Sequence, residues 1–209
     1  MIWLEELKLN LNNFFKLKRC INFDSLNVKK IMKKRVLFIV DPKADFFVGD
    51  DKLPQSDKIV PIINKLIDNK KFDFIISSNN HCDYEKNSIK LHTKLNLDNI
   101  PIFIKSKKDD SYSSFNSFNN ILGTLEQFLK KNNINEIYVV GMIGDMGVKD
   151  TSLDCSVFLD TYFIVDATKF IDKMNPTVEK LVKNGVMVIN SNDIDIFLSN
   201  ENYYENKIK

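Results

Sequence analysis

The sequence predicts an α/β fold, a three-layer α/β/α sandwich whose mainly parallel sheet is covered by helices on both faces. One observation is a set of short apolar runs with the length and composition of buried strands; they are 36–40, 72–78, 100–104, 137–140, 162–165 and 186–189. Segments with helical spacing alternate with these runs, as in sheets built from strand–helix–strand units. The 209 residues are 44% hydrophobic, which is enough for the core of one domain.

Composition gives no reason to expect nucleic acid or a membrane as a partner, and it indicates a cellular compartment. The 30 basic and 28 acidic side chains leave a net charge of +2, so charge gives no argument for nucleic acid or a membrane surface. No apolar run approaches the roughly 18 residues that a membrane helix needs. Cys20, Cys82 and Cys155 are an odd number without paired spacing, which favours a reducing compartment. We therefore expect a cytoplasmic protein.

Residues 1–31 differ from the rest of the chain. Apolar and polar residues alternate there at near-helical spacing, and the segment then becomes basic. We predict an N-terminal extension over 1–31, helical or disordered, and a domain over 32–209. Glu5 and Glu6 count against an organellar transit peptide, which is usually poor in acids. A helix docked on the domain, a targeting peptide and an extension without function stay open.

The first strand, 36–40, is apolar on both faces and is expected in the middle of the sheet. It is followed by Asp41, and a helix with apolar residues at i, i+3, i+4 and i+7 is predicted over 57–67. The run 72–78 leads to Asn79 and His81, and the run 100–104 leads to Lys105. Without further matches, Asp41 is interpreted as a carboxylate that caps the turn after the strand, and Lys105 as a charged side chain in contact with water.

A helix is predicted over 121–130, and the segment 134–155 follows it. Its strand at 137–140 ends at Gly141, a second glycine follows at Gly147, and a helix is predicted over 148–154. Such a turn points the free N–H groups of the helix at the carboxyl end of the strand, where negative charge can be held. Many α/β proteins contain such a turn only because the packing of strand and helix requires it, so this alternative stays open. A helix over 178–182 ends at Asn184-Gly185, and the last strand is 186–189.

The segment 134–155 resembles the nucleophile turn of the nicotinamidase/isochorismatase family of cysteine-hydrolase-like proteins, G-x-x-T/x-D-x-C-V-K/R-x-T-A-x-D-A. The matching residues are Gly141, Asp145, Val148, Lys149, Thr151, Leu153 and Asp154, followed by Val165-Asp166-Ala167. Residues 41–46 are similar to the family's D-x-Q-N-D-F, with Lys43 and Ala44 in place of Gln-Asn, and 110–115 are similar to D-S-Y-S-x-F. The resemblance covers about 35–197 and implies the isochorismatase-like fold.

The resemblance also implies an active site. Asp41 stands at the catalytic acid/base position and Lys105 at that of the family's lysine. Backbone N–H groups of Ile143 and Gly147 correspond to the oxyanion hole, next to a cis peptide. Gly147 occupies the position of the nucleophilic cysteine, so it can donate its N–H but cannot attack.

Two other cysteines are candidate substitutes. Cys155 is expected in the core about 12 Å beyond Gly147, at 1.5 Å per helical residue. Cys82 lies beside His81 and would need a rebuilt geometry.

The family's D-W-H-P segment, which binds a divalent metal such as Zn²⁺ or Fe²⁺, corresponds to Asn79-Asn80-His81, with His92 further on. Asn79, His81 and His92 are therefore the candidate metal ligands. The neutral amide oxygen of Asn79 is a poorer ligand than the carboxylate it replaces.

The implied function is that of a nicotinamidase-like protein, whose family reaction hydrolyses nicotinamide to nicotinate and ammonia in NAD salvage. Because of Gly147, we expect impaired or absent catalysis. One alternative is a cysteine-independent isochorismatase-type hydrolase with Asp41 as general acid, since that branch also carries glycine here. Another is a non-enzymatic subunit of an oligomer. The implied partners are a nicotinamide-like or isochorismate-like ligand and further copies of the chain in a homo-oligomer.

Overall fold

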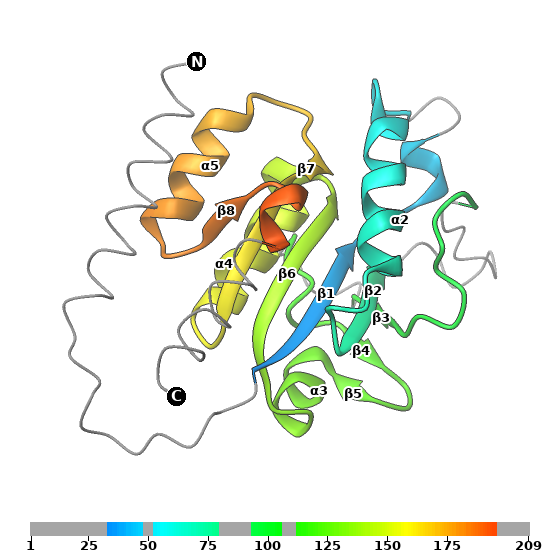
Figure 1. The fold of residues 1–209 in the computed structure, drawn as a ribbon, viewed down its shortest axis with the longest axis vertical. Helices are drawn as coiled ribbons and strands as arrows, with labels where there is room; N and C mark the ends of the chain where they lie inside the picture. The colour runs from blue at the N-terminus through cyan, green and yellow to red at the C-terminus, as the bar shows by residue number, and fades with distance from the viewer. Residues whose placement is uncertain (1–32, 48–51, 80–92, 106–111, 196–209) are drawn as a thin grey trace. The chain divides into compact units, whose positions relative to one another are not determined.

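The computed structural model describes residues 33–47, 52–79, 93–105 and 112–195, and these form a single sheet with helices packed on it (Figure 1). The extension predicted over 1–31 lies outside the described residues, as do His81, His92, Cys20 and Cys82. Within the described part, no helix is long and apolar enough to cross a membrane.

The described sheet has eight strands in the order β5-β4-β3-β2-β1-β6-β7-β8. The strands are β1 (Lys34–Val40), β2 (Phe74–Asn79), β3 (Ile102–Ile104), β4 (Phe118–Asn119), β5 (Gly123–Thr124), β6 (Ile134–Met142), β7 (Asp160–Lys169) and β8 (Met187–Ile189). The short β4 pairs antiparallel with both β3 and β5, and the other described neighbours are parallel. The predicted parallel sheet with β1 in its middle is therefore confirmed.

Both faces of the sheet are covered. The longer helices are α2 (Val60–Asp68), α3 (Leu125–Lys131), α4 (Lys149–Ser156) and α5 (Met174–Lys183). Ile63 of α2 shares one core cluster with Leu37 and Ile39 of β1. The intervening Phe38 is equally buried and points to the other face, because side chains alternate along a strand. The predicted α/β/α layering follows from this burial on both faces.

Several element boundaries differ from the prediction. The helix predicted from residue 121 begins at Leu125, because Thr124 forms a capping box with Gln127 and Gly123 adopts a φ of 82°. The strand predicted from residue 100 begins at Ile102. Pro101 precedes it and has no N–H to donate to a ladder, although its carbonyl accepts from Ser77 N.

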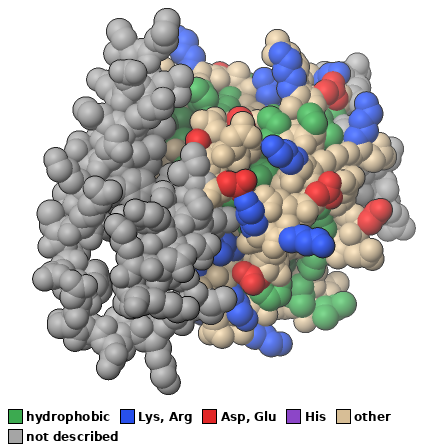
Figure 2. Space-filling view, in the orientation of Figure 1, with side chains coloured by type: hydrophobic (Ala, Val, Ile, Leu, Met, Phe, Trp, Pro, Cys, Tyr) green, Lys and Arg blue, Asp and Glu red, His purple; other side chains and the backbone are tan. Residues whose placement is uncertain are grey.

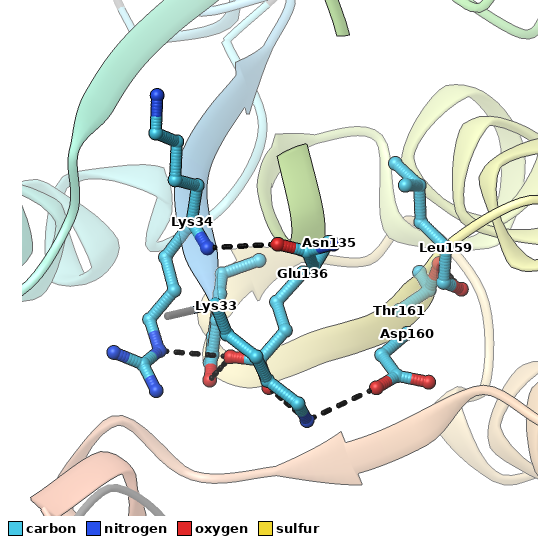
Figure 3. Close-up of polar contacts among 9 residues, drawn as sticks. Lys33, Lys34, Asn135, Glu136, Leu159, Asp160 and Thr161 are labelled. Carbon is cyan, nitrogen blue, oxygen red and sulfur yellow. Dashed lines mark hydrogen bonds and ion pairs between the residues drawn. The ribbon is translucent and has the colours of Figure 1, made fainter. Parts of the chain in front are cut away.

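The amino ends of β1, β6 and β7 carry a network of charged side chains (Figure 3). Glu136 is 1% exposed and accepts from Lys33 Nζ at 2.8 Å and from Arg35 Nε at 2.8 Å. Tyr138 donates its hydroxyl to the same carboxylate at 3.2 Å, and Lys33 also pairs with Asp160 at 3.2 Å. The network joins the amino ends of three adjacent strands, at the opposite end of the sheet from Asp41.

Burial raises the pKa of Glu136, but the hydrogen bonds and charges of Lys33 and Arg35 outweigh it and hold that pKa below its ordinary value of 4.5. Burial and the charge of Glu136 raise the pKa of Tyr138, so its hydroxyl stays protonated as a donor. Elsewhere charge is dispersed: on the face shown in Figure 2, basic and acidic side chains are interspersed.

Candidate functional site

The carboxyl ends of β1, β2, β3 and β6 meet at one edge of the sheet, where parallel α/β folds bind ligands. Asp41 follows β1 there with a φ of 47° and is 2% exposed. Gly141 of β6 lies against the end of β1, since a Cβ built on it would be 2.2 Å from the carbonyl oxygen of Val40. Gly141 also has a φ of 122°, so this approach of β6 to Asp41 requires glycine.

Asp41 is held by Ser78, at the end of β2. The Ser78 hydroxyl donates to Asp41 Oδ1 at 3.2 Å, and the backbone N–H of Asp41 donates to Ser78 Oγ at 3.3 Å. Ser78 was not among the predicted site residues. The available signal is the pair Ser77-Ser78 at the end of an otherwise apolar buried strand, where polar groups need partners.

Lys105 follows β3 and is 8% exposed, so its side chain is not the solvated charge that its place in the sequence alone suggests. Its backbone N–H donates to the carbonyl of Asn79 at 3.2 Å. Its ammonium group lies 5.8 Å from the ring centroid of Tyr112, within the range of a cation–π contact. The structure thus places a buried cation at the same edge of the sheet as Asp41.

The turn after β6 begins with a cis peptide between Met142 and Ile143 and continues as one π-type turn over Gly144–Val148. The carbonyl of Ile143 accepts from the N–H groups of Met146 at 3.1 Å and Val148 at 3.2 Å. Ile143 and Gly147, the predicted oxyanion-hole residues, lie in this one turn. The cis peptide stands where the resemblance implies one.

Gly147 is buried and faces the end of β1. A Cβ built on it would lie 3.3 Å from the carbonyl oxygen of Tyr112, 3.6 Å from Val40 Cγ1 and 3.7 Å from the carbonyl oxygen of Met142. These are ordinary or slightly tight contacts, so the turn has room for a small side chain. Gly144 differs, because a Cβ there would be 2.8 Å from both Phe170 and Thr168.

Two carboxylates of the motif tie the turn and β7 to their surroundings. Asp145 accepts from the backbone N–H groups of Ile171 at 2.9 Å and Asp172 at 3.3 Å. Asp166 accepts from the N–H of Ser191 at 2.8 Å and from its hydroxyl at 2.6 Å. Both side chains therefore anchor neighbouring loops in this protein.

Cys155 is fully buried in α4, as expected for a core residue. Burial and the neighbouring charge of Asp154 raise the pKa of its thiol above the ordinary value of 9.0. A thiol that stays protonated in the core cannot act as the missing nucleophile.

Asn79 is 3% exposed, and its side-chain oxygen has no hydrogen-bond partner among the described residues. The described ranges contain no group of three His, Cys, Asp or Glu side chains that could hold a metal ion. The described donor set is therefore one neutral amide oxygen, which does not fit Zn²⁺ or Fe²⁺. The predicted metal site remains a prediction that rests on His81 and His92.

No protein-family model matches the sequence. Two curated relatives are similar to it, and both are nicotinamidases. One, from Acinetobacter baylyi, is 32% identical over 123 residues, which are 54% of this chain and 57% of that protein. The chain thus matches little more than half the length of this relative. The other, from Schizosaccharomyces pombe, is 24% identical over 183 residues, which cover 64% of this chain and 81% of that protein.

Solved structures show the same fold. The pyrazinamidase of Pyrococcus horikoshii in complex with zinc has a TM-score of 0.62 at 23% identity, covering 75% of this chain and 99% of its own. An L. infantum protein in complex with nicotinate has a TM-score of 0.65 at 21% identity, with coverages of 80% and 98%. An isochorismatase-like hydrolase from Alkaliphilus metalliredigens has a TM-score of 0.63 at 16% identity, with coverages of 78% and 96%. The chain is thus similar in sequence to nicotinamidases and has the isochorismatase-like fold, and both similarities support the nicotinamidase/isochorismatase family.

Proposed function

We propose that this protein binds a small planar ligand of the nicotinamide or nicotinate type at the carboxyl edge of its sheet and does not hydrolyse the amide through a cysteine. The observation that carries the proposal is Gly147. It lies in the turn expected of the nucleophile, beside Val40 and the Tyr112 carbonyl, without a side chain that could attack. The curated relatives are nicotinamidases, and one structural neighbour holds nicotinate, which supports the ligand class.

The retained groups suit a polar ligand. Asp41 supplies a carboxylate and Lys105 a cation, and both are buried. Buried charged groups form strong hydrogen bonds with a ligand, because water competes poorly for them. Removal of a nucleophile typically lowers the rate by several orders of magnitude, so a ligand can be bound here without being cleaved.

A second candidate is hydrolysis of an isochorismate-like vinyl ether with Asp41 as general acid. The observation that favours it is the same glycine, which lies beside Val40, together with the buried Asp41 that directly follows Val40. Proton donation by a carboxylic acid needs no covalent intermediate and therefore no cysteine. Assembly into a homo-oligomer, a purely structural role and a cytoplasmic location stay predictions of the sequence.

Calorimetric titration of the purified protein with nicotinamide and with nicotinate tests the proposal. We expect binding of at least one of them and no release of ammonia. Binding of nicotinamide, whose amide N–H can donate to the carboxylate, should be weakened by about tenfold or more in Asp41→Asn, because a hydrogen bond to a charged group contributes about 1.5–3 kcal/mol. Lys105→Ala should weaken nicotinate more than nicotinamide, since nicotinate carries the negative charge.

Asp160→Asn is the matched control, as Asp160 lies at the amino end of the sheet, far along the strands from Asp41, and should bind as wild type does. Ammonia release by wild type would contradict the interpretation of Gly147. Equal binding by wild type, Asp41→Asn and Lys105→Ala would place the ligand elsewhere. Turnover of isochorismate that is lost in Asp41→Asn would favour the second candidate.

A further inference from the structure

Two serines without a role in the family resemblance connect Asp41 to the helix that follows Gly147. Ser78 is the last residue but one of β2, and Ser114 falls at the unspecified position of the D-S-Y-S-x-F motif. Both are fully buried. The Ser114 hydroxyl donates to Ser78 Oγ at 2.9 Å, and the Ser78 hydroxyl donates to Asp41 Oδ1 at 3.2 Å. The two hydroxyls thus form one chain that ends on the carboxylate.

The hydrogen bonds of Ser78 leave its hydroxyl no second orientation. A hydroxyl has one proton to donate and two lone pairs that accept. Ser78 Oγ accepts from Ser114 and from the backbone N–H of Asp41, so its one proton is committed to Asp41 Oδ1. A hydroxyl that accepts a hydrogen bond is also a stronger donor, because chained hydrogen bonds polarise one another.

Ser114 is fixed in turn by α4. Its backbone N–H donates to Thr151 Oγ1 at 2.8 Å, and its carbonyl accepts the Ser117 hydroxyl at 2.5 Å. Thr151 is fully buried in the first turn of α4, the helix that begins directly after Gly147 and Val148. The chain of contacts Thr151–Ser114–Ser78–Asp41 therefore links the carboxylate to the helix that carries the Gly147 turn.

We propose that Ser78 and Ser114 are positioning residues that orient the Asp41 carboxylate relative to the Gly147 turn. The inference rests on the proposed function, in which Asp41 contacts the ligand. Ser77, the neighbour of Ser78 on β2, shows the contrast. It is equally buried, but its hydroxyl donates to backbone carbonyls, to Ile39 at 3.0 Å and to Ser78 at 3.3 Å, which is the ordinary way to satisfy a buried serine.

A double-mutant cycle tests the inference, with nicotinamide and nicotinate as the titrated probes. Because a small displacement of a functional group is costly, we expect Ser78→Ala to weaken binding about tenfold and Ser114→Ala about threefold. In the Asp41→Gly background both effects should fall below about twofold, since residues of one network are not additive. Glycine adopts the φ of Asp41 without strain, so this variant removes the side chain with its carboxylate and leaves the backbone conformation accessible. Ser77→Ala is the matched control and should leave both dissociation constants unchanged.

The cycle separates this inference from the proposed function. If Asp41→Gly lowers affinity but Ser78→Ala does not, or if Ser78→Ala costs the same with and without Asp41, the two serines are structural and the inference is wrong. If wild type binds neither probe, the proposed function fails. Wild type, Ser78→Ala, Asp41→Gly and the double variant are then compared by urea unfolding. Coupled free energies of unfolding for Ser78→Ala and Asp41→Gly then support the link, and additive ones overturn it.

Discussion

Gly147→Cys is expected to give the protein an ammonia-releasing activity toward nicotinamide, at least about three orders of magnitude above wild type. The substitution supplies a thiol at the position where the resemblance predicts the nucleophile, beside Val40, which directly precedes Asp41, and in the turn whose N–H groups are the predicted oxyanion hole. The measurement is ammonia release at saturating nicotinamide, for wild type and variant side by side.

The structure admits the new side chain. Its Cβ would meet the Tyr112 carbonyl oxygen at 3.3 Å, which calls for a shift of a few tenths of an ångström, and its other contacts are ordinary. Gly147→Ala is the matched control, because it adds the same Cβ without a thiol. It should release no ammonia from nicotinamide. Asp41→Asn in the Gly147→Cys background should remove most of the gained activity.

Other outcomes of this experiment are equally informative. A folded Gly147→Cys protein that releases no ammonia would mean that the site no longer orients nicotinamide. Activity already present in wild type would mean that the protein has another nucleophile, and Cys82 would be the first residue to replace.

Glu136→Gln is expected to lower the free energy of unfolding at neutral pH by about 2–4 kcal/mol, because it removes the anion shared by Lys33 and Arg35 at the amino ends of the strands. Glu136 is 1% exposed, whereas Lys33 and Arg35 are 32% and 19% exposed and keep some contact with water. The loss should therefore be smaller than for a fully buried pair. Urea unfolding followed by circular dichroism measures it.

Asp160→Asn provides the matched control, since Asp160 pairs with the same Lys33 but is 52% exposed. Exposed pairs contribute little, so we expect a change below about 1 kcal/mol. A Glu136→Gln protein as stable as Asp160→Asn would show that the network in Figure 3 does not stabilise the fold.

The effect of Glu136 also depends on pH. Its pKa in the folded protein lies below its ordinary value of 4.5, so the folded state binds its proton less readily than the unfolded chain does. The stabilisation is therefore complete above about pH 4.5 and is lost as the pH falls through the lower folded value. The difference between wild type and Glu136→Gln should be constant from pH 7 to pH 5 and should shrink below that range.

Residue patterns alone predict the sheet and the residues at the ends of its strands. Runs such as 36–40 and 137–140 are apolar at every position, which only a strand buried on both faces requires, and they became β1 and β6. Asp41 and Lys105 follow such runs directly, so the parallel arrangement brings them to one edge. The resemblance to the family added the prediction that Gly147 stands at the position of the nucleophile.

The contacts that these residues make depend on the folded arrangement of the elements. Ser78, Ser114 and Thr151 form hydrogen bonds across 36 and 37 positions of the chain, and no local periodicity reports such pairs. The buried state of Lys105 and the loop contacts of Asp145 likewise depend on which elements pack beside them. Sequence spacing reports local geometry, whereas these contacts are set by the order β3-β2-β1-β6 and by the helices that close over it.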